Sequence, residues 1–275
     1  VINGDDMGLG KTLETIFSCE IEDLFPCVIV TLSSVKYHWE TLWKKTNKNR
    51  TVSVLSSGSK KNDFASDVLI INYEMLGKKV KGETKEEDVI TPKYTELFNT
   101  PFQCVVFDEV HRIKSNKTIM GKMASRLAKK PEYVFGLTGT LVLNKPVEIV
   151  NPLSVLRVFD DLFGNWNSFI YRYCDAEQTE YGVNTSGASN TFELNEMLKS
   201  NCYFRREKHE VQDDLPELQI NVLDAEITNI KEYTKAETNL IDYLEMNYSV
   251  MRAQSALMAE FLVMRNVLRQ LSGKG

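Results

Sequence analysis

This sequence of 275 residues lacks the features that mark disulfide-bonded, metal-binding and membrane proteins. Its five cysteines are odd in number and include no C-x-x-C pair, so we expect neither a disulfide framework nor a zinc site. Its three histidines are scattered, which argues against a metal cluster. No apolar run approaches the about 18 residues of a membrane helix, and no signal peptide is visible. We therefore expect an intracellular protein without a membrane partner, nuclear in a eukaryote and cytoplasmic in a bacterium or virus.

The charge balance also lacks a basic excess, since the formal net charge is −5. A strongly basic chain would have pointed to nucleic acid, but binding depends on a local basic face rather than on the total. Taken singly, each basic cluster reads as a solvated surface. The clusters are Lys44, Lys45, Lys48 and Arg50; Arg112, Lys114 and Lys117; and Arg205, Arg206 and Lys208.

The first 150 residues alternate short apolar runs with helical patterns. The runs are continuous and rich in β-branched residues, as in strands covered on both faces. Such alternation predicts an α/β fold with a parallel sheet flanked by helices. The predicted strands are 27–32, 51–55, 67–73, 104–109 and 133–139. The predicted helices between them begin at residues 12, 34 and 119. The opening VIN also reads as a strand, so we expect sequence upstream of it.

Strands become scarce after about residue 145, and helical patterns dominate at 146–174, 192–201 and 227–271. The charged stretch 77–93 and the polar stretch 175–191 read as exposed loops. We therefore expect a nucleotide-binding domain over residues 1–150. Residues 151–275 are expected to form a helical extension.

The stretch DDMGLGKT ends like a phosphate-binding loop, although the strict spacing wants glycine where Asp5 stands. It follows a strand and opens a helix, whose free N–H groups and positive dipole end attract an anion. The glycines allow the backbone to approach phosphate, the lysine reaches the terminal phosphates and the threonine holds magnesium. On its own, the motif could also be a chance glycine-rich turn. Its expected ligands are Gly8, Leu9, Gly10, Lys11 and Thr12.

Two later motifs also end apolar strands. CVVFDEVH delivers paired acids to the edge where α/β sheets bind ligands. There, Asp108 can orient magnesium and Glu109 can take a proton from water. GLTGT offers the hydroxyls of Thr138 and Thr140 near the same edge. A solvated strand end and an ordinary turn are the alternative interpretations.

In this order, DDMGLGKT, VFDEVHRIKS and LTGT resemble motifs I, II and III of superfamily-two helicase-like ATPases, most closely Swi/Snf-type DNA translocases. That family's first motif lacks the first glycine. VIVTLSSVKYHWETLW resembles motif Ia with Trp39, and DVLIINYEML resembles motif Ib. NCYFRREKHEVQDDLPEL resembles the family's R-R-x-K segment, and LRQLSG resembles the end of the first lobe, close to the annealing-helicase branch.

The resemblance implies a RecA-like lobe that binds ATP and magnesium, in an ATP-dependent translocase on double-stranded DNA of any sequence. It implies that His111, Thr138 and Thr140 couple nucleotide to DNA. The implied contacts to the DNA backbone are Thr31, Ser33, Asn72, Tyr73 and Lys114.

The sequence also departs from the family pattern. Leu141 stands where the family has proline after T-G-T. The upstream adenine-reading motif and the second lobe, with its arginine finger, have no counterpart in this sequence. We therefore expect the first half of a motor that needs the second RecA-like lobe of its full-length chain for activity.

The sequence also admits two other functions. A P-loop kinase or GTPase-like switch would lack the acid pair followed by RIKS and the R-R-x-K segment. An ATP-binding scaffold or assembly protein with a degenerate motor is disfavoured by the intact Lys11 and Glu109.

Overall fold

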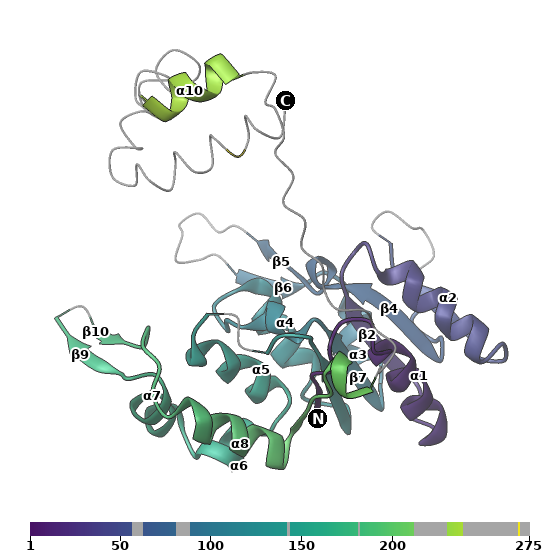
Figure 1. Cartoon of the computed structure of the whole chain (residues 1–275). Helices are drawn as coiled ribbons and strands as arrows, with labels where there is room; N and C mark the ends of the chain where they lie inside the picture. The colour runs from purple at the N-terminus through teal and green to yellow at the C-terminus, as the bar shows by residue number, and fades with distance from the viewer. Residues whose placement is uncertain are drawn as a thin grey trace. The chain divides into compact units, whose positions relative to one another are not determined.

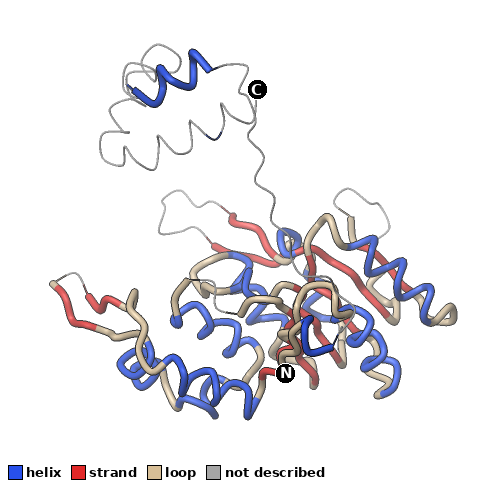
Figure 2. The backbone as a smooth tube through the Cα atoms, viewed as in Figure 1, coloured by secondary structure: helices blue, strands red, loops and turns tan. Residues whose placement is uncertain are grey.

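The computed structural model describes residues 1–56, 63–80, 89–141, 144–180, 182–211 and 230–238, together with residue 269. The chain divides into two compact units, Val1–Leu215 and Pro216–Gly275. The first unit contains the sheet and its flanking helices, shown as a ribbon in Figure 1 and as a tube in Figure 2.

A seven-stranded sheet lies at the centre of the first unit, in the order β11-β1-β8-β7-β2-β4-β3. Every neighbouring pair is parallel, so the predicted parallel α/β sheet is confirmed. Its strands are β1 (Ile2–Asn3), β2 (Cys27–Thr31), β3 (Val52–Val54), β4 (Val68–Asn72), β7 (Cys104–Asp108), β8 (Tyr133–Leu137) and β11 (Tyr203–Phe204).

Helices cover both faces of this sheet, because alternate strand residues point to opposite sides. On one face, Ile29 of β2 belongs to the same apolar cluster as Trp39. On the other, Val30 belongs to a larger cluster with Leu127. Figure 1 shows α1 and α2 on one side and α4 and α5 on the other. These helices are α1 (Lys11–Ile21), α2 (Lys36–Thr46), α4 (Ile119–Leu127) and α5 (Val150–Val155).

Short helices connect the strands and continue after β8, as predicted. Four aromatic rings of α6 and α7 form one buried cluster with centroid separations of 4.9 to 5.6 Å. These rings are Phe159, Phe163, Phe169 and Tyr173. The remaining helices are η1 (Tyr73–Met75), α3 (Thr95–Asn99), η3 (Val110–Ile113), η4 (Pro146–Ile149), α6 (Phe159–Phe163), α7 (Trp166–Tyr173), α8 (Thr191–Asn201) and α9 (Lys208–Val211).

The expectation of a loop over 77–93 was wrong at both of its ends. There, β5 (Gly77–Val80) and β6 (Val89–Pro92) form an antiparallel pair. A β-carbon on Gly77 would lie 2.5 Å from Met123 Cγ, so this pair packs tightly on α4 through glycine. The stretch 175–191 is exposed as expected, but it also contains an antiparallel pair, β9 (Glu177–Thr179) and β10 (Gly182–Asn184).

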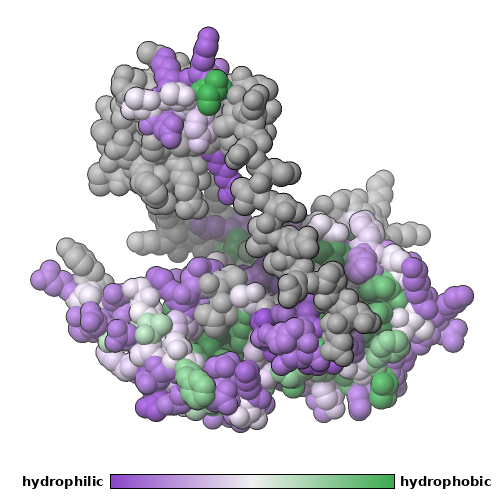
Figure 3. Space-filling view, in the orientation of Figure 1, coloured by the Kyte–Doolittle hydropathy of each residue, from purple (hydrophilic) through white to green (hydrophobic). Residues whose placement is uncertain are grey.

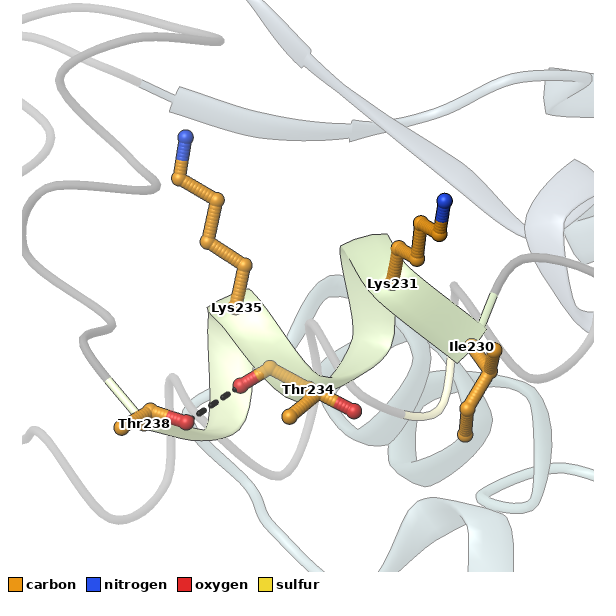
Figure 4. A pocket seen from close by; sticks show the side chains of 5 residues that line it. All are labelled: Ile230, Lys231, Thr234, Lys235 and Thr238. Carbon is orange, nitrogen blue, oxygen red and sulfur yellow. Dashed lines mark hydrogen bonds between the residues drawn. The ribbon is translucent and has the colours of Figure 1, made fainter.

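Two sequence features fall partly outside the described residues. Of the helical pattern at 227–271, the structure describes α10 (Ile230–Thr238) and residue 269. In α10, Lys231 and Lys235 project to the same side, and Thr238 Oγ1 donates to the Thr234 carbonyl at 2.6 Å (Figure 4). The L-P end of the R-R-x-K segment, Leu215 and Pro216, also lies outside the described residues.

The described surface is mainly hydrophilic on the face shown in Figure 3, with apolar residues scattered among the polar ones. Along the described parts of the chain, no helix combines the length and the apolar character needed to cross a bilayer.

Candidate nucleotide site

The phosphate loop occupies the short connection between β1 and α1. Gly8 and Gly10 adopt φ values of 92° and 93°, a left-handed conformation that glycine reaches without a steric penalty. Gly10 caps the N-terminus of α1, an eleven-residue helix. Free helical N–H groups therefore follow two left-handed glycines, as an anion cradle requires.

Lys11 begins α1 and turns back onto this loop. Its ammonium group donates to the carbonyl of Asp5 at 2.5 Å and to that of Asp6 at 3.2 Å. A β-carbon added to Gly139 would lie 4.0 Å from Lys11 Nζ. The loop lysine therefore lies beside the T-G-T turn that follows β8.

Asp108 ends β7, and its neighbours fix the orientation of its carboxylate. Oδ2 accepts a 2.7 Å hydrogen bond from the Thr31 hydroxyl and a 3.0 Å bond from the Trp39 indole. The Asp108 carbonyl accepts a 2.7 Å bond from the Tyr73 hydroxyl. No hydrogen bond from the described residues uses Oδ1, so this oxygen is available to a cation.

Glu109 follows with a left-handed backbone, φ 54° and ψ 55°. Such a conformation is strained for a non-glycine residue and is common at active sites. Burial and the adjacent charge of Asp108 raise the pKa of Glu109. The charges of His111 and Lys11 and a hydrogen bond from Thr138 act in the opposite direction. A carboxylate of raised pKa suits a proton acceptor.

His111 and Thr138 link this carboxylate to the T-G-T turn. His111 Nδ1 lies 3.3 Å from Glu109 Oε2 and 2.9 Å from Thr138 Oγ1. Thr138 is fully buried, and its hydroxyl donates to the Thr140 carbonyl at 3.0 Å. The direction of the bond between His111 Nδ1 and Thr138 Oγ1 is set by the tautomer of the imidazole ring. Thr140 N donates to the same oxygen at 3.1 Å, which closes the turn.

These residues fit a magnesium nucleotide. The cradle that begins at Gly8 and Lys11 would hold the phosphates, and Asp108 Oδ1 with the Thr12 hydroxyl would hold magnesium. The parallel register explains the convergence: β7 and β8 are neighbours, and Asp108 pairs with Leu137, the residue before Thr138.

The five residues expected to contact DNA differ in their exposure to solvent. Ser33 and Lys114 are exposed. Lys114 Nζ pairs with Glu148 Oε1 at 2.7 Å. Asn72 is largely buried, accepting from Lys36 Nζ at 3.1 Å and donating to Glu74 at 2.7 Å.

Thr31 and Tyr73 require a correction. Both side chains are fully buried and their hydroxyls are bound to Asp108, so neither presents a surface to DNA. Thr31 ends β2, the neighbour of β7, and Tyr73 directly follows β4, the next strand along the sheet. Both hydroxyls instead support Asp108, one through its carboxylate and one through its carbonyl. Burial raises the pKa of Tyr73, with the nearby charges of Asp108 and Glu109 acting in the same direction, so its hydroxyl stays a donor.

Sequence reasoning missed the contacts that surround the phosphate loop from a distance along the chain. Asp5 and Asp6 accept hydrogen bonds from Arg206 and Arg205 respectively. In the sequence, these arginines stand out only as part of the R-R-x-K segment and of a basic cluster. The signal that could have paired them was the acidic residue at the first position of the loop.

Comparison with known proteins decides the family. Residues 1–273 match the SNF2-related domain. The chain belongs to this family. The resemblance seen in its motifs is thereby confirmed.

The SNF2-related chain is similar to two curated relatives. It is 31% identical over 236 residues to the SWI/SNF-related matrix-associated actin-dependent regulator of chromatin subfamily A-like protein 1 of Xenopus tropicalis, covering 84% of this chain and 23% of that protein. It is 30% identical over 221 residues to the DNA annealing helicase and endonuclease ZRANB3 of Bos taurus, covering 77% and 19%. The chain thus spans about a quarter or less of these relatives.

A solved structure agrees with the fold of the SNF2-related chain. The SWI2/SNF2 ATPase core of Sulfolobus solfataricus in complex with dsDNA aligns with a TM-score of 0.59 at 23% identity. The match covers 98% of this chain and 53% of that one. The RecA-like architecture expected from the motifs is therefore confirmed.

Proposed function

We propose that this chain is the first motor lobe of an ATP-dependent translocase on double-stranded DNA. The observation that carries the proposal is the convergence of Lys11, Glu109 and Thr138 at one edge of the sheet. The similar proteins support it, because one is a DNA annealing helicase and another is an ATPase core in complex with dsDNA. In this proposal residues 1–150 bind the nucleotide, and 151–275 form a helical extension toward a second lobe.

The nucleotide is ATP with magnesium, which neutralises phosphate charge and polarises the phosphoryl oxygens when bound. Residues 8–12 and Asp108 hold this pair. Glu109 takes the proton of the attacking water. Because the T-G-T turn reaches Glu109 through His111 and Thr138, a change at the nucleotide can be passed along this chain of hydrogen bonds.

The DNA contacts are non-specific and go to the phosphate backbone. We place Ser33 and Lys114 directly on this track, because both are exposed. Asn72 lies beside this track rather than on it: it stands at the end of β4, which pairs with the end of β2, and its buried amide is bonded to Lys36 and Glu74. Ser33 follows β2, so Ser33 and Asn72 extend neighbouring strands.

DNA-stimulated ATP hydrolysis by the full-length protein is the test of this function. The translocase requires turnover that rises when duplex DNA is added, whatever its sequence. ATP binding without turnover would instead support the degenerate-motor scaffold. Absence of both binding and turnover would contradict any nucleotide function.

The pH dependence of turnover reports on Glu109. This residue accepts a proton only when ionised, and its pKa is raised. We expect kcat to fall about tenfold per pH unit on an acid limb that lies above the usual glutamate pKa. Thr138→Val removes a hydrogen bond that lowers this pKa, so the limb should move to higher pH. A limb at or below the ordinary value, in steady-state assays across pH, would contradict the assignment.

Salt dependence of duplex binding reports on Lys114. Each phosphate contact releases a counterion and contributes about −0.9 to the slope of log K against log salt. We expect Lys114→Ala to weaken binding equally on two unrelated sequences and to flatten the slope by about that amount. Ser33→Ala should change affinity but not slope, because a hydroxyl releases no counterion.

Lys44→Ala is the matched control for this salt titration by fluorescence anisotropy. Lys44 is also an exposed, ion-paired lysine, 2.6 Å from Glu40. It should leave the slope unchanged. A slope insensitive to Lys114, or equally sensitive to both lysines, would count against the proposed track.

A further inference from the structure

Residues Tyr203–Lys208 run alongside the phosphate loop. β11 pairs with β1 in parallel, Ile2 with Tyr203 and Asn3 with Phe204. The backbone bonds continue past the strands, from Gly4 N to the Phe204 carbonyl at 2.7 Å and from Asp6 N to the Arg206 carbonyl at 3.1 Å. The first half of the phosphate loop is therefore built on this segment, which we call the arginine latch.

Asp5 is the centre of this contact. Its side chain is fully buried, Oδ1 accepts from Arg206 N at 2.8 Å, and Oδ2 accepts from Arg206 Nε at 3.0 Å. Arg206 Nη2 donates to the same oxygen and to Glu14 of α1. Burial would raise the pKa of Asp5. The hydrogen bonds and charge of Arg206, with the charge of Lys11, outweigh burial and lower this pKa.

Arg205 and Lys208 contact the same loop. Arg205 donates to Asp6 Oδ1 at 2.7 Å and to the Gly139 carbonyl at 3.0 Å, which joins the loop to the T-G-T turn. Lys208 N donates to Asp6 Oδ2 at 3.2 Å. A β-carbon on Gly8 would lie 3.8 Å from Lys208 Nζ, so this ammonium lies over the glycine of the anion cradle.

We propose that the arginine latch holds the phosphate loop in its nucleotide-binding shape, with Arg206 as a positioning residue that acts through the Asp5 carboxylate. Asp5, which stands in place of the strict motif's first glycine, is then the residue to which the latch binds. The loop backbone between Asp5 and Gly10 is fixed at Lys11 by α1 and at Asp5 by Arg206. The inference rests on the proposed ATP-binding function of this loop.

A double-mutant cycle on the full-length protein tests the latch. Affinity for a fluorescent ATP analogue with magnesium would be measured for Arg206→Gln, Asp5→Asn and the double variant. A misplaced loop should cost Arg206→Gln about 10- to 100-fold in Kd, since an unpaired buried carboxylate is the worst of the three states. Adding Asp5→Asn removes that charge, so the double variant should bind ATP more tightly than Arg206→Gln alone.

Arg206→Lys tests whether the shape of the guanidinium group matters in addition to its positive charge. It keeps the cation but not the planar two-donor fork, so its affinity should fall between those of the unmodified protein and Arg206→Gln. Arg172→Gln is the matched control, because Arg172 forms the same kind of two-donor pair with Glu193 in the helical region. It should bind ATP like the unmodified protein. Thermal melting identifies any variant that fails to fold. If Arg206→Gln does not fold, the ATP affinities of Arg206→Lys and Asp5→Asn test the latch instead.

The outcomes separate the latch from the function on which it rests. If the unmodified protein and Lys11→Ala both fail to bind ATP, the proposed function is wrong and the latch falls with it. If the unmodified protein binds, Lys11→Ala does not, and the Arg206 variants bind normally, only the latch is overturned. Additive losses at Asp5 and Arg206 would also overturn it, because they would show that Arg206 does not act through Asp5.

Discussion

Replacing Glu109 with glutamine is expected to leave ATP binding intact and to slow hydrolysis about 10²- to 10⁴-fold. The amide keeps the size and the hydrogen-bonding reach of the carboxylate, but it cannot accept the proton of the attacking water. Isothermal calorimetry on the full-length protein gives the affinity, and phosphate release gives the turnover.

Lys11→Ala is the contrasting variant for Glu109→Gln. Its ammonium is the side-chain cation at the start of α1, beside both the loop and Gly139. We expect its removal to abolish nucleotide binding, and turnover with it. Equal loss of ATP affinity in the two variants would contradict the separate roles assigned to them.

The 275-residue chain alone should hydrolyse ATP hardly at all, with or without DNA. In related phosphoryl-transfer systems, an arginine supplied by a partner element contributes about 10³- to 10⁵-fold to the rate. No arginine here lies in a sequence that resembles the motif carrying that finger. The measurement is DNA-stimulated phosphate release by this chain, compared with the full-length protein at equal concentration.

One result of this measurement would contradict the need for a second lobe. Robust DNA-stimulated turnover by the 275-residue chain would show that the site is complete within one lobe. Glu109→Gln in the same chain serves as the control, since turnover that this substitution does not reduce comes from a contaminating ATPase.

The sheet could be predicted because its central strands carry their own signal. A run such as 104–107 is continuously apolar and includes two β-branched valines, which suits burial on both faces. β11 has no such signal. It is two residues long, and its partner lies about 200 positions earlier in the chain, so only the tertiary fold reveals it. The antiparallel pairing of β5 with β6 was not predicted, because the charged residues of this stretch suggested exposure to solvent rather than pairing.

The motifs of the site could be predicted from the sequence, but the hydrogen-bond partners of its side chains could not. Lys11, Glu109 and Thr138 follow strands whose ends must meet, so their convergence could be anticipated. The direction of the Thr31 hydroxyl could not, because strand position does not show which group a side chain contacts. Leu141 is buried in the core where the family has proline, so its apolar character serves packing after the turn.

The long sequence separation between Asp5 and Arg206 has a consequence for synthesis on the ribosome. Folding proceeds from the N-terminal side as the chain emerges, and β2, β4 and β7 can pair once about residue 108 is available. The phosphate loop cannot follow them, because its buried carboxylate finds its counter-charge 201 residues later. A nascent chain that ends before β11 and this arginine could have the central strands paired but would have an unfinished loop. Under the proposed function, the order of translation thus delays nucleotide capture until Arg206 has emerged.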